Sequence, residues 1–447
     1  MSAPDAMSES LNYPMQKRRA VASRSYRVKI SPNNGQNFTS GQTVNIDMPS
    51  NLAGTYCNWN QCYLKFKAVT DVSGNLDRCG AAGFISRVQC MTAGAQIFDL
   101  PNWNVLMTIL MDGDSSPAYK AGVGNVLMGT YGAFQAGEQL GVDARTYCVP
   151  FVLHPFGMST PHRLQPLFSS APVQFKITLE SGSNALRSAS AATITFSEVE
   201  LVCVFTELSP GAQAQVDQMS GGVYNVLASS YQNVGTTMGS DSAVTANLGL
   251  SVSSLERIIV CHRPTGTINT PAAYSLGNRA KNGLQQYSIF INGEQYPARP
   301  VVVENKGAEA LAEYLLSDHS LVNFDKASSF NIAINGNTTI TSNGLDGNSV
   351  QLAPLEPYIA ETPTGTSAGS LAAASDVGSF ITAVELETGL SDGRSQRLYS
   401  GVSTISSTVN YRGVYSGAAA AQIDFFAQFT ILLSLNSRGT NVWSVSV

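Results

Sequence analysis

Apolar and polar residues alternate with a period of two in many short segments, which is the pattern of half-buried β-strands. Tyr26, Val28 and Ile30 form the first such run. Val44, Ile46 and Met48 form the next, and we expect these two runs to be the first paired strands. Similar runs lie at 62–68, 84–90, 147–153, 173–179, 193–205, 223–229, 255–261, 287–291, 330–334, 380–386, 403–411 and 425–435. The pattern predicts a mainly β protein.

The segment Tyr287–Leu316 joins a hairpin, an extended stretch and a helix. Asn292-Gly293 predicts a type I′ turn, because both central residues of that turn need positive φ angles. Pro297 and Pro300 favour an extended chain, and Asn305 can cap the helix that follows. The expected apolar face of that helix consists of Ala308, Leu311, Ala312 and Leu315. None of this requires a catalytic residue.

The same order of elements is predicted once in the first half. A hairpin is expected from Phe84 to Phe98 through Ala93-Gly94. Pro101 then opens a helix, and Gly113 is placed to stop it. The expected apolar face of this helix consists of Trp103, Leu106, Met107 and Leu110.

The length of 447 residues suggests two or three domains or one duplicated architecture. Leu208–Gly222 is polar and rich in turn residues, and we place the boundary there. About eight strands then fall in each half, which is the count expected of a jelly roll made of two four-stranded sheets. We therefore predict a flexible basic N-terminal arm at 1–24 and two consecutive eight-stranded jelly rolls at 25–209 and 210–447, each with a short inserted helix. Thr362–Ser379 lacks periodicity and is expected to be an exposed loop.

Charged residues make up only 13% of the chain, and Gly alone contributes 39 residues. So little charge leaves a large surface poorly solvated, which indicates oligomerisation. The formal net charge of −5 argues against a general nucleic-acid binder, because such proteins use a basic surface to displace counterions.

Positive charge is concentrated near the amino terminus at Lys17, Arg18, Arg19 and Arg24. Such an arm is a candidate for contact with nucleic acid or another acidic partner. The alternative is a solvated arm, or one that clamps a neighbouring subunit.

The standard catalytic patterns are missing. The sequence contains no phosphate-binding G-x-x-x-x-G-K-[ST] loop, and none of His154, His162, His262 and His319 begins an H-E-x-x-H pair. Asp112-Gly-Asp114 lacks the further ligands of a calcium loop and fits a turn better. Glu385 and Glu387 could form a glycosidase pair, but Glu-Leu-Glu in a strand usually marks its solvent side. We predict no enzyme activity, no cofactor and no metal site.

The seven cysteines are Cys57, Cys62, Cys79, Cys90, Cys148, Cys203 and Cys261. They lack CxxC spacing, and Cys57 and Cys62 have no nearby histidine, so buried free thiols are expected.

The residues after Met1 do not form a secretory signal, which predicts synthesis inside a cell without secretion. Phe425–Leu435 is too short to span a bilayer and reads as a core strand.

Four segments together resemble the double jelly-roll major capsid proteins of the adenovirus-hexon-like lineage, especially those of polinton-like viruses and adintoviruses. Phe84–Leu110 is similar to the family's strand-turn-strand-helix segment. Arg163, Leu164, Pro166 and Leu167 match a basic residue before Leu-x-Pro-Leu, within Pro150–Leu179. Tyr287–Leu316 resembles the Ile-Asn-Gly, Tyr-Pro and Arg-Pro element, and Leu398–Thr404 resembles a Ser-Gly-Ile-Asn-Thr turn. The order and spacing of the four segments along the chain, more than any one of them, are the basis of the resemblance.

The resemblance implies a structural protein of the virion. It implies homotrimers that form pseudo-hexagonal capsomers, and neighbouring capsomers that tile an icosahedral shell around a double-stranded DNA genome. Penton and minor capsid proteins would be further partners, and the arm could touch the genome or an internal membrane.

Two other readings of the residues remain. A carbohydrate-binding or adhesive β-sandwich could stack sugars on exposed aromatics such as Trp59, Trp103 or Trp443. Against it, Trp103 lies on the apolar face of its predicted helix, where a core position is expected. A β-sandwich hydrolase could use an acidic pair.

Overall fold

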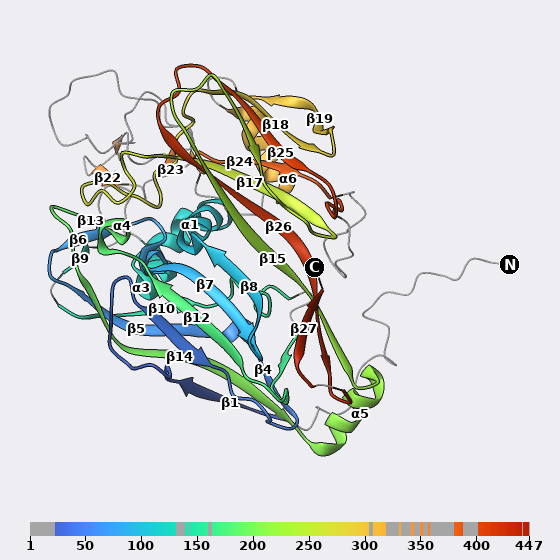
Figure 1. Ribbon diagram of the computed structural model, residues 1–447. Coiled ribbons are helices and arrows are strands. Elements are labelled where there is room, and N and C mark those ends of the chain that lie inside the picture. The colour runs from blue at the N-terminus through green and yellow to red at the C-terminus, as the bar shows by residue number, and fades with distance from the viewer. Residues whose placement is uncertain are drawn as a thin grey trace.

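The computed structural model describes residues 23–130, 139–141, 143–159, 163–303, 307–318, 330–331, 341–343, 349–351, 356–357, 380–387, 401–439 and 441–446. Figure 1 shows the strands of the first half gathered at the lower left and those of the second half at the upper right. Helix α5 (Pro210–Ser220) joins them at the bottom of the view.

The first half contains a sheet of seven strands, a sheet of four and a small sheet of three. The seven strands are β1 (Ser23–Ile30), β2 (Phe38–Thr39), β4 (Thr55–Cys57), β5 (Tyr63–Thr70), β10 (Arg145–Pro150), β11 (Gln165–Pro166) and β14 (Ile194–Leu208). The four strands are ordered β3 (Thr43–Asp47), β12 (Val173–Leu179), β7 (Ile85–Thr92) and β8 (Ala95–Pro101). The small sheet contains β13 (Leu186–Ser188), β6 (Gly74–Leu76) and β9 (Gln139–Leu140).

The second half contains a sheet of five strands and a sheet of four. The five strands are β15 (Val223–Met238), β26 (Ala421–Asn436), β17 (Leu255–Pro264), β24 (Thr382–Glu385) and β27 (Trp443–Ser446). The four strands are ordered β16 (Ala243–Asn247), β25 (Val409–Tyr415), β18 (Leu284–Ile291) and β19 (Glu294–Val302). Two short pairs are β20 (Phe330–Asn331) with β23 (Glu356–Pro357), and β21 (Thr341–Asn343) with β22 (Ser349–Gln351).

Helices of one to three turns lie between these strands. They are η3 (Trp59–Gln61), η4 (Gly80–Phe84), α1 (Trp103–Asp114), α2 (Pro117–Tyr119), the π-helix η5 (Lys120–Gly124), α3 (Asn125–Met128), α4 (Gly182–Ala185), α5 and α6 (Ala308–Ser317). None of the described helices is long and apolar enough to cross a membrane.

Aromatic side chains fill the space between the facing sheets of each half. Phe175 of β12 packs edge-on against Phe151 at 5.3 Å between ring centroids. In the second half, Tyr411 of β25 meets Phe425 of β26 at 5.0 Å. The hydroxyl of Tyr287 on β18 donates to the carbonyl of Ala383 on β24 at 3.1 Å. Both halves are therefore sandwiches of packed antiparallel sheets.

Both predicted hairpins are confirmed. Asn292 and Gly293 have φ angles of 51° and 86° and connect β18 to β19. Ala93 and Gly94 have φ angles of 46° and 82° and connect β7 to β8. Positive φ at both central residues is the requirement of a type I′ turn, so local sequence determines both connections.

Three predictions about longer-range organisation differ from the structure. The first two runs do not pair with each other, because β1 pairs with β14 and β3 pairs with β12. Neither half consists of two four-stranded sheets, because the two larger sheets have seven and four strands in the first half and five and four in the second. Leu208–Gly222 is mostly helix α5, in which the Ser209 side chain accepts a hydrogen bond from the amide of Ala212. Alternation identifies a strand and its faces, but not its partner.

The predicted helix faces are confirmed in part. Trp103 and Leu106 of α1 are buried, and Met107, Leu110, Leu311 and Leu315 pack partly buried against the core. In α6 the buried residues are Ala310, Tyr314 and Ser317, whereas Ala308 is exposed and Leu311 is half-buried. Asn305 lies outside the described residues, and the residue before the helix is Gly307, with a φ of 61°. In α1, Gly113 lies within the last turn and is buried, so it does not stop the helix.

Candidate functional site: a buried junction and an exposed edge strand

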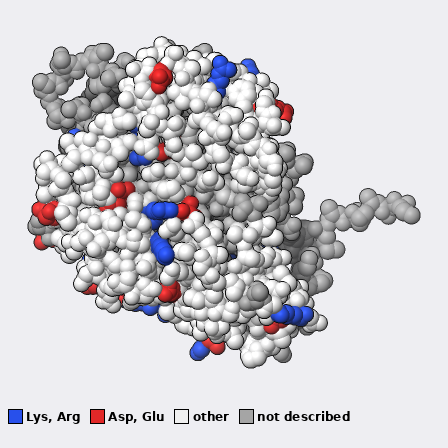
Figure 2. Space-filling model, in the orientation of Figure 1, with Lys and Arg blue, Asp and Glu red and all other residues white. Residues whose placement is uncertain are grey.

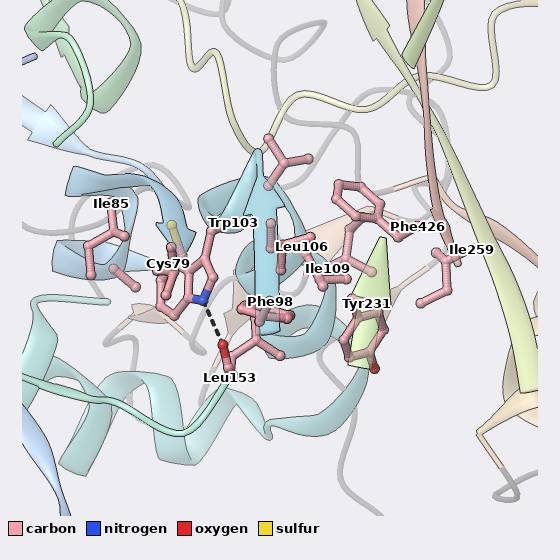
Figure 3. Close-up of a cluster of buried hydrophobic side chains, with 14 of the residues drawn as sticks. Cys79, Ile85, Phe98, Trp103, Leu106, Ile109, Leu153, Tyr231, Ile259 and Phe426 are labelled. Atoms are coloured by element: carbon pink, nitrogen blue, oxygen red, sulfur yellow. Dashed lines mark hydrogen bonds between the residues drawn. The ribbon is translucent and has the colours of Figure 1, made fainter. Parts of the chain in front are cut away.

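Helix α1 lies where the two halves meet. Its first residue, Trp103, is fully buried and donates its indole N–H to the carbonyl of Leu153 at 3.1 Å. Figure 3 shows Leu106 and Ile109 of α1 beside side chains of both halves: Phe98, Tyr231, Ile259 and Phe426. The junction thus has an apolar core continuous with both sandwiches.

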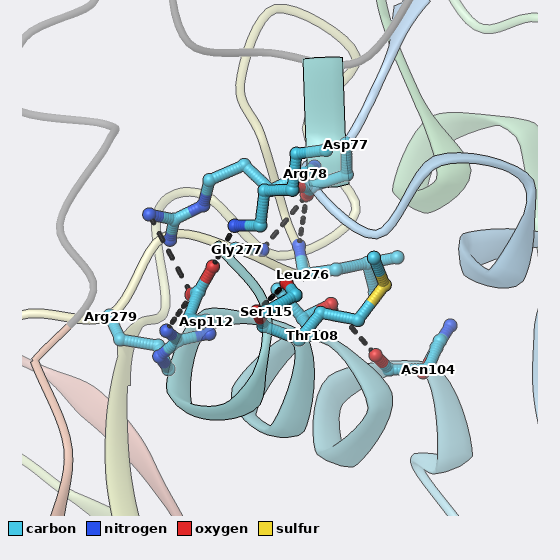
Figure 4. A network of polar contacts seen from close by, with 11 residues as sticks. Asp77, Arg78, Asn104, Thr108, Asp112, Ser115, Leu276, Gly277 and Arg279 are labelled. Carbon is cyan, nitrogen blue, oxygen red and sulfur yellow. Dashed lines mark hydrogen bonds and ion pairs between the residues drawn. The ribbon is translucent and has the colours of Figure 1, made fainter. Parts of the chain in front are cut away.

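A buried carboxylate with cationic partners lies at the end of α1 (Figure 4). Asp112 is fully buried, and its Oδ1 is 2.7 Å from the Lys120 ammonium. Its Oδ2 accepts a hydrogen bond from Arg279 and lies 3.9 Å from Nη1 of Arg78. Burial alone would raise the pKa of Asp112, but the charges of Lys120, Arg78 and Arg279 lower it below its usual value. Asp112 is therefore held as a carboxylate.

A second carboxylate binds backbone amides of the other half. One oxygen of Asp77 accepts hydrogen bonds from the amides of Leu276 and Gly277, both at 2.9 Å. Its other oxygen accepts from the amide of Arg78 at 2.7 Å. A Cβ at Gly277 would lie 2.3 Å from Asp77 Oδ1 and 2.7 Å from Arg78 Nε, so the approach requires glycine.

Arg279, Leu276 and Gly277 belong to the connection between β17 and β18, whereas Asp77, Asp112 and Lys120 belong to the first half. The network therefore joins the two halves by directional contacts that tolerate little displacement. Removing one partner of a buried ion pair typically costs about 3–5 kcal/mol, because the remaining charge is left without compensation. The ion pairs and hydrogen bonds of this site therefore serve to hold the two halves together.

A second buried network lies within the second half. Arg257 donates to Oε1 of Gln428 at 2.7 Å and to the Tyr231 hydroxyl at 3.2 Å, and it approaches Asp318 at 3.3 Å. The amide of Gln428 donates to Glu256 at 2.6 Å. These contacts connect β15, β17 and β26 to the residue after α6.

Strand β1 forms an edge beside β14 and is mostly exposed. Arg24 lies in this strand, where Nη2 is 2.6 Å from the Glu207 carboxylate and the guanidinium sits 5.5 Å from the Tyr26 ring. Of the residues predicted for the basic arm, the structure therefore places Arg24 in a sheet. Lys17, Arg18 and Arg19 lie outside the described residues.

The aromatics proposed for sugar stacking are buried. Trp59, Trp103 and Trp443 have exposed fractions of 2%, 0% and 3%. Trp59 packs on Phe175 at 5.3 Å, and Trp443 packs on Phe156 at 5.1 Å. The core position expected for Trp103 is confirmed, whereas the exposure that sugar stacking requires of Trp59 and Trp443 is contradicted, because each fills a core position. The chain contains no further tryptophan.

The acidic residues considered for metal binding or catalysis lie in regular secondary structure or beside it. Asp112-Gly-Asp114 forms the last turn of α1 instead of a loop turn. Glu385 does not lie on a solvent face, since it is half-buried at the end of β24. Burial raises the pKa of Glu385 to about 7, and the hydrogen bond from the amide of Glu387 opposes this only in part.

The buried histidines have pKa values that keep them neutral. Burial lowers the pKa of His154 to about 3 and that of His262 to about 4. The ring centroids of His154 and Trp59 are 4.4 Å apart, and Nε2 of His262 lies 2.8 Å from the Tyr415 hydroxyl. His162 and His319 lie outside the described residues.

All seven cysteines are free, and six are buried. Sequence spacing does not show that Cys57, Cys62 and Cys203 converge. The pairing of β4 with β14, which sets Cys57 opposite Phe205, brings them together. No local signal could have revealed it, because Cys203 belongs to a distant strand.

Comparison with known proteins gives matches in structure but not in sequence. No model of a protein family matches the chain, and the search of curated proteins found no match either. A chain of the PBCV-1 virus capsid matches with a TM-score of 0.59 at 11% identity, over 97% of this chain and 98% of that one. The Faustovirus major capsid protein matches with a TM-score of 0.56 at 10% identity, over 94% and 91%.

A chain from the structure of the Sputnik virophage matches with a TM-score of 0.53 at 9% identity, over 100% of this chain and 93% of that one. Each match extends through both sandwiches and the junction, so the similarity concerns the whole arrangement. The chain has the double jelly-roll fold found in viral major capsid proteins.

Proposed function

We propose that this chain is a major capsid protein. Three copies form a pseudo-hexagonal capsomer, and capsomers tile the icosahedral shell of a double-stranded DNA virus. The observation that carries the proposal is the nearly complete overlap, in both directions, with chains of the PBCV-1 virus capsid and the Faustovirus major capsid protein. A shared single sandwich would be weak support, because sandwiches serve many functions.

The mechanism is geometric in this proposal. Residues 25–209 and 210–447 each form one jelly roll, and the buried junction holds the two at a fixed angle. A rigid pair of similar bodies lets three chains present six similar outer faces. Neighbouring capsomers, penton proteins and minor capsid proteins are the partners, and the virion is the location after synthesis in the host cell.

The surface suits extensive protein contacts. Figure 2 shows a face on which charged residues are few and widely spaced. Large apolar side chains are also exposed, including Met219 at 87%, Val126 at 74% and Ile405 at 53%. Interface cores are depleted of charge and enriched in methionine, so these positions are suited to burial between subunits.

The direct test is the assembly state of the purified full chain. We expect trimers or larger species in analytical ultracentrifugation and ordered lattices or shells in electron micrographs. A stable monomer at every ionic strength, without lattices, would overturn the proposal. Retention on glycan resin together with a monomeric state would instead favour the carbohydrate-binding alternative, and release of sugars would favour a hydrolase.

A further inference from the structure

Three cysteine side chains from separate segments meet in the core of the first half. Cys57 ends β4, Cys62 precedes β5, and Cys203 lies in β14. Their sulfur atoms all lie within 4.8 Å of one another, and those of Cys57 and Cys62 are 3.7 Å apart. The exposed fractions of the three residues are 0%, 3% and 0%.

The spacing fits one shared metal ion. A zinc–sulfur bond of about 2.3 Å places two sulfur ligands about 3.8 Å apart in tetrahedral geometry and about 4.0 Å apart in a trigonal plane. The sulfur atoms of Cys57 and Cys62 are already at nearly the tetrahedral separation. The upper bound of 4.8 Å for the other two separations exceeds the tetrahedral value by about 1 Å. Small side-chain rotations would close the site.

The donor set selects the class of ion. Three sulfur atoms without a carboxylate or imidazole in the group favour thiophilic metals over Mg²⁺ or Ca²⁺. The carbonyl of Asn58, which accepts a hydrogen bond from the Cys62 thiol at 3.1 Å, lies beside the sulfurs as a nearby oxygen.

We propose that Cys57, Cys62 and Cys203 form a binding site for one thiophilic metal ion of the zinc type. Binding releases the thiol protons and ties β4, the β4–β5 connection and β14 to a single point. Because β14 pairs with β1, β2, β4 and β5, the ion would strengthen the sheet that carries the exposed edge strand. This inference does not depend on the proposed function.

The test uses the full chain, reduced and freed of metal by a chelator, then titrated with Cd²⁺. Bound Cd²⁺ is detected by sulfur-to-metal charge-transfer absorption and by metal analysis after gel filtration. The key variant is Cys203→Ala, and its matched control is Cys90→Ala, because Cys90 is also a fully buried strand cysteine but lies outside the group. Circular dichroism verifies that each variant folds.

We expect one Cd²⁺ per chain and a higher melting temperature for the unaltered protein and for Cys90→Ala. Cys203→Ala should bind at least about tenfold more weakly, since even the loss of a residue that only supports a ligand costs 10–100-fold. If Cys203→Ala does not fold, Cys57→Ser takes its place. Absent charge-transfer absorption in the unaltered protein, or equal binding by Cys203→Ala and Cys90→Ala, would overturn the site. A Cys57–Cys62 disulfide, found by mass spectrometry of thiol-blocked native protein, would overturn it too.

Discussion

Asp112 connects the two halves through buried ion pairs. It is fully buried and meets Lys120 from its own half and Arg279 from the other. The negative charge of Asp112 offsets the desolvation cost of burying Lys120 and Arg279. Their positive charges offset the desolvation cost of burying the carboxylate. The effect of a substitution here should therefore exceed what the loss of one hydrogen bond would give.

The substitution Asp112→Asn preserves size but removes the charge. We expect it to lower the free energy of unfolding by about 3–5 kcal/mol, because the cations are left undercompensated in the core. Urea denaturation followed by fluorescence measures this. The matched control is Asp99→Asn, which breaks the partly exposed pair with Arg87 and should cost less than about 1 kcal/mol. Equal losses in the two variants would contradict the importance of the junction.

Glu385 should give stability a measurable pH dependence. Its pKa is about 7 in the folded protein, against an ordinary value of 4.5. Between these values the folded state holds a proton that the unfolded state has released, so this residue's contribution to stability falls as pH rises from 4.5 to 7. Glu385→Gln should remove that fall.

The difference in unfolding free energy between Glu385→Gln and the unaltered protein should therefore grow from pH 4.5 to 7 and stay constant above it. His154 and His262, whose pKa values are lowered, act in the opposite direction, reducing stability as pH falls below about 6.5. Their effect is common to both proteins and cancels in the difference. A difference that does not vary with pH would contradict the raised pKa.

At the scale of elements, α1 and α6 approach each other at a glycine. A Cβ at Gly113 would lie 2.2 Å from the Tyr314 hydroxyl oxygen and 3.1 Å from its ring carbon Cζ. The sequence suggests a helix stop at Gly113, but its small size instead admits a tyrosine from the other half.

Gly113→Ala should destabilise the protein by about 1–3 kcal/mol through overpacking, although alanine is the better helix former. The same change in a Tyr314→Phe background should cost less, because the closest atom is gone. Gly122→Ala is the matched control, since its Cβ would have no neighbour within 4 Å. Thermal unfolding of the unaltered protein, Gly113→Ala, Tyr314→Phe and the double variant forms a double-mutant cycle. A coupling energy near zero would contradict the contact.

The elements that sequence predicts well are those set by neighbours along the chain. Asn292-Gly293 and Ala93-Gly94 form the expected hairpins because turn geometry is decided by two residues. The pairing of β1 with β14 could not be predicted, because every strand presents the same backbone N–H and C=O groups to a neighbour. The buried face of α6 also differs from the periodic one, since Tyr314 enters a space that α1 and its own half create.

At the scale of the whole molecule, assembly should depend on the segment before β1. Because β1 begins at Ser23, removal of residues 1–22 leaves the strand and the Arg24–Glu207 pair intact. We expect the shortened chain to form trimers with unchanged thermal stability but to close shells poorly. Sedimentation and electron microscopy measure the two properties, and normal shells would exclude a role for the arm in assembly.

A variant with an arm of the same length but without its positive charges separates the two interpretations of the arm. Replacing Lys17, Arg18 and Arg19 with glutamine keeps its length. If the arm binds nucleic acid or anionic lipid through charge, this variant should behave like the deletion, and the unaltered protein should lose the interaction as salt increases. If the arm clamps a neighbouring subunit by packing, the variant should assemble normally.

Residue type and local spacing are sufficient to predict the β-rich class, both hairpins, the doubled order of strands and inserted helices, and a surface with few charges. Only tertiary packing sets which strands pair, the meeting of Asp112 with Arg279 at the junction, the burial of Trp59 and Trp443, and the convergence of Cys57, Cys62 and Cys203. Strand pairing and the meeting of Cys203 with Cys57 and Cys62 join residues far apart in the chain, and they arise when a sandwich closes. The Asp112–Arg279 pair arises only when the two sandwiches pack on each other.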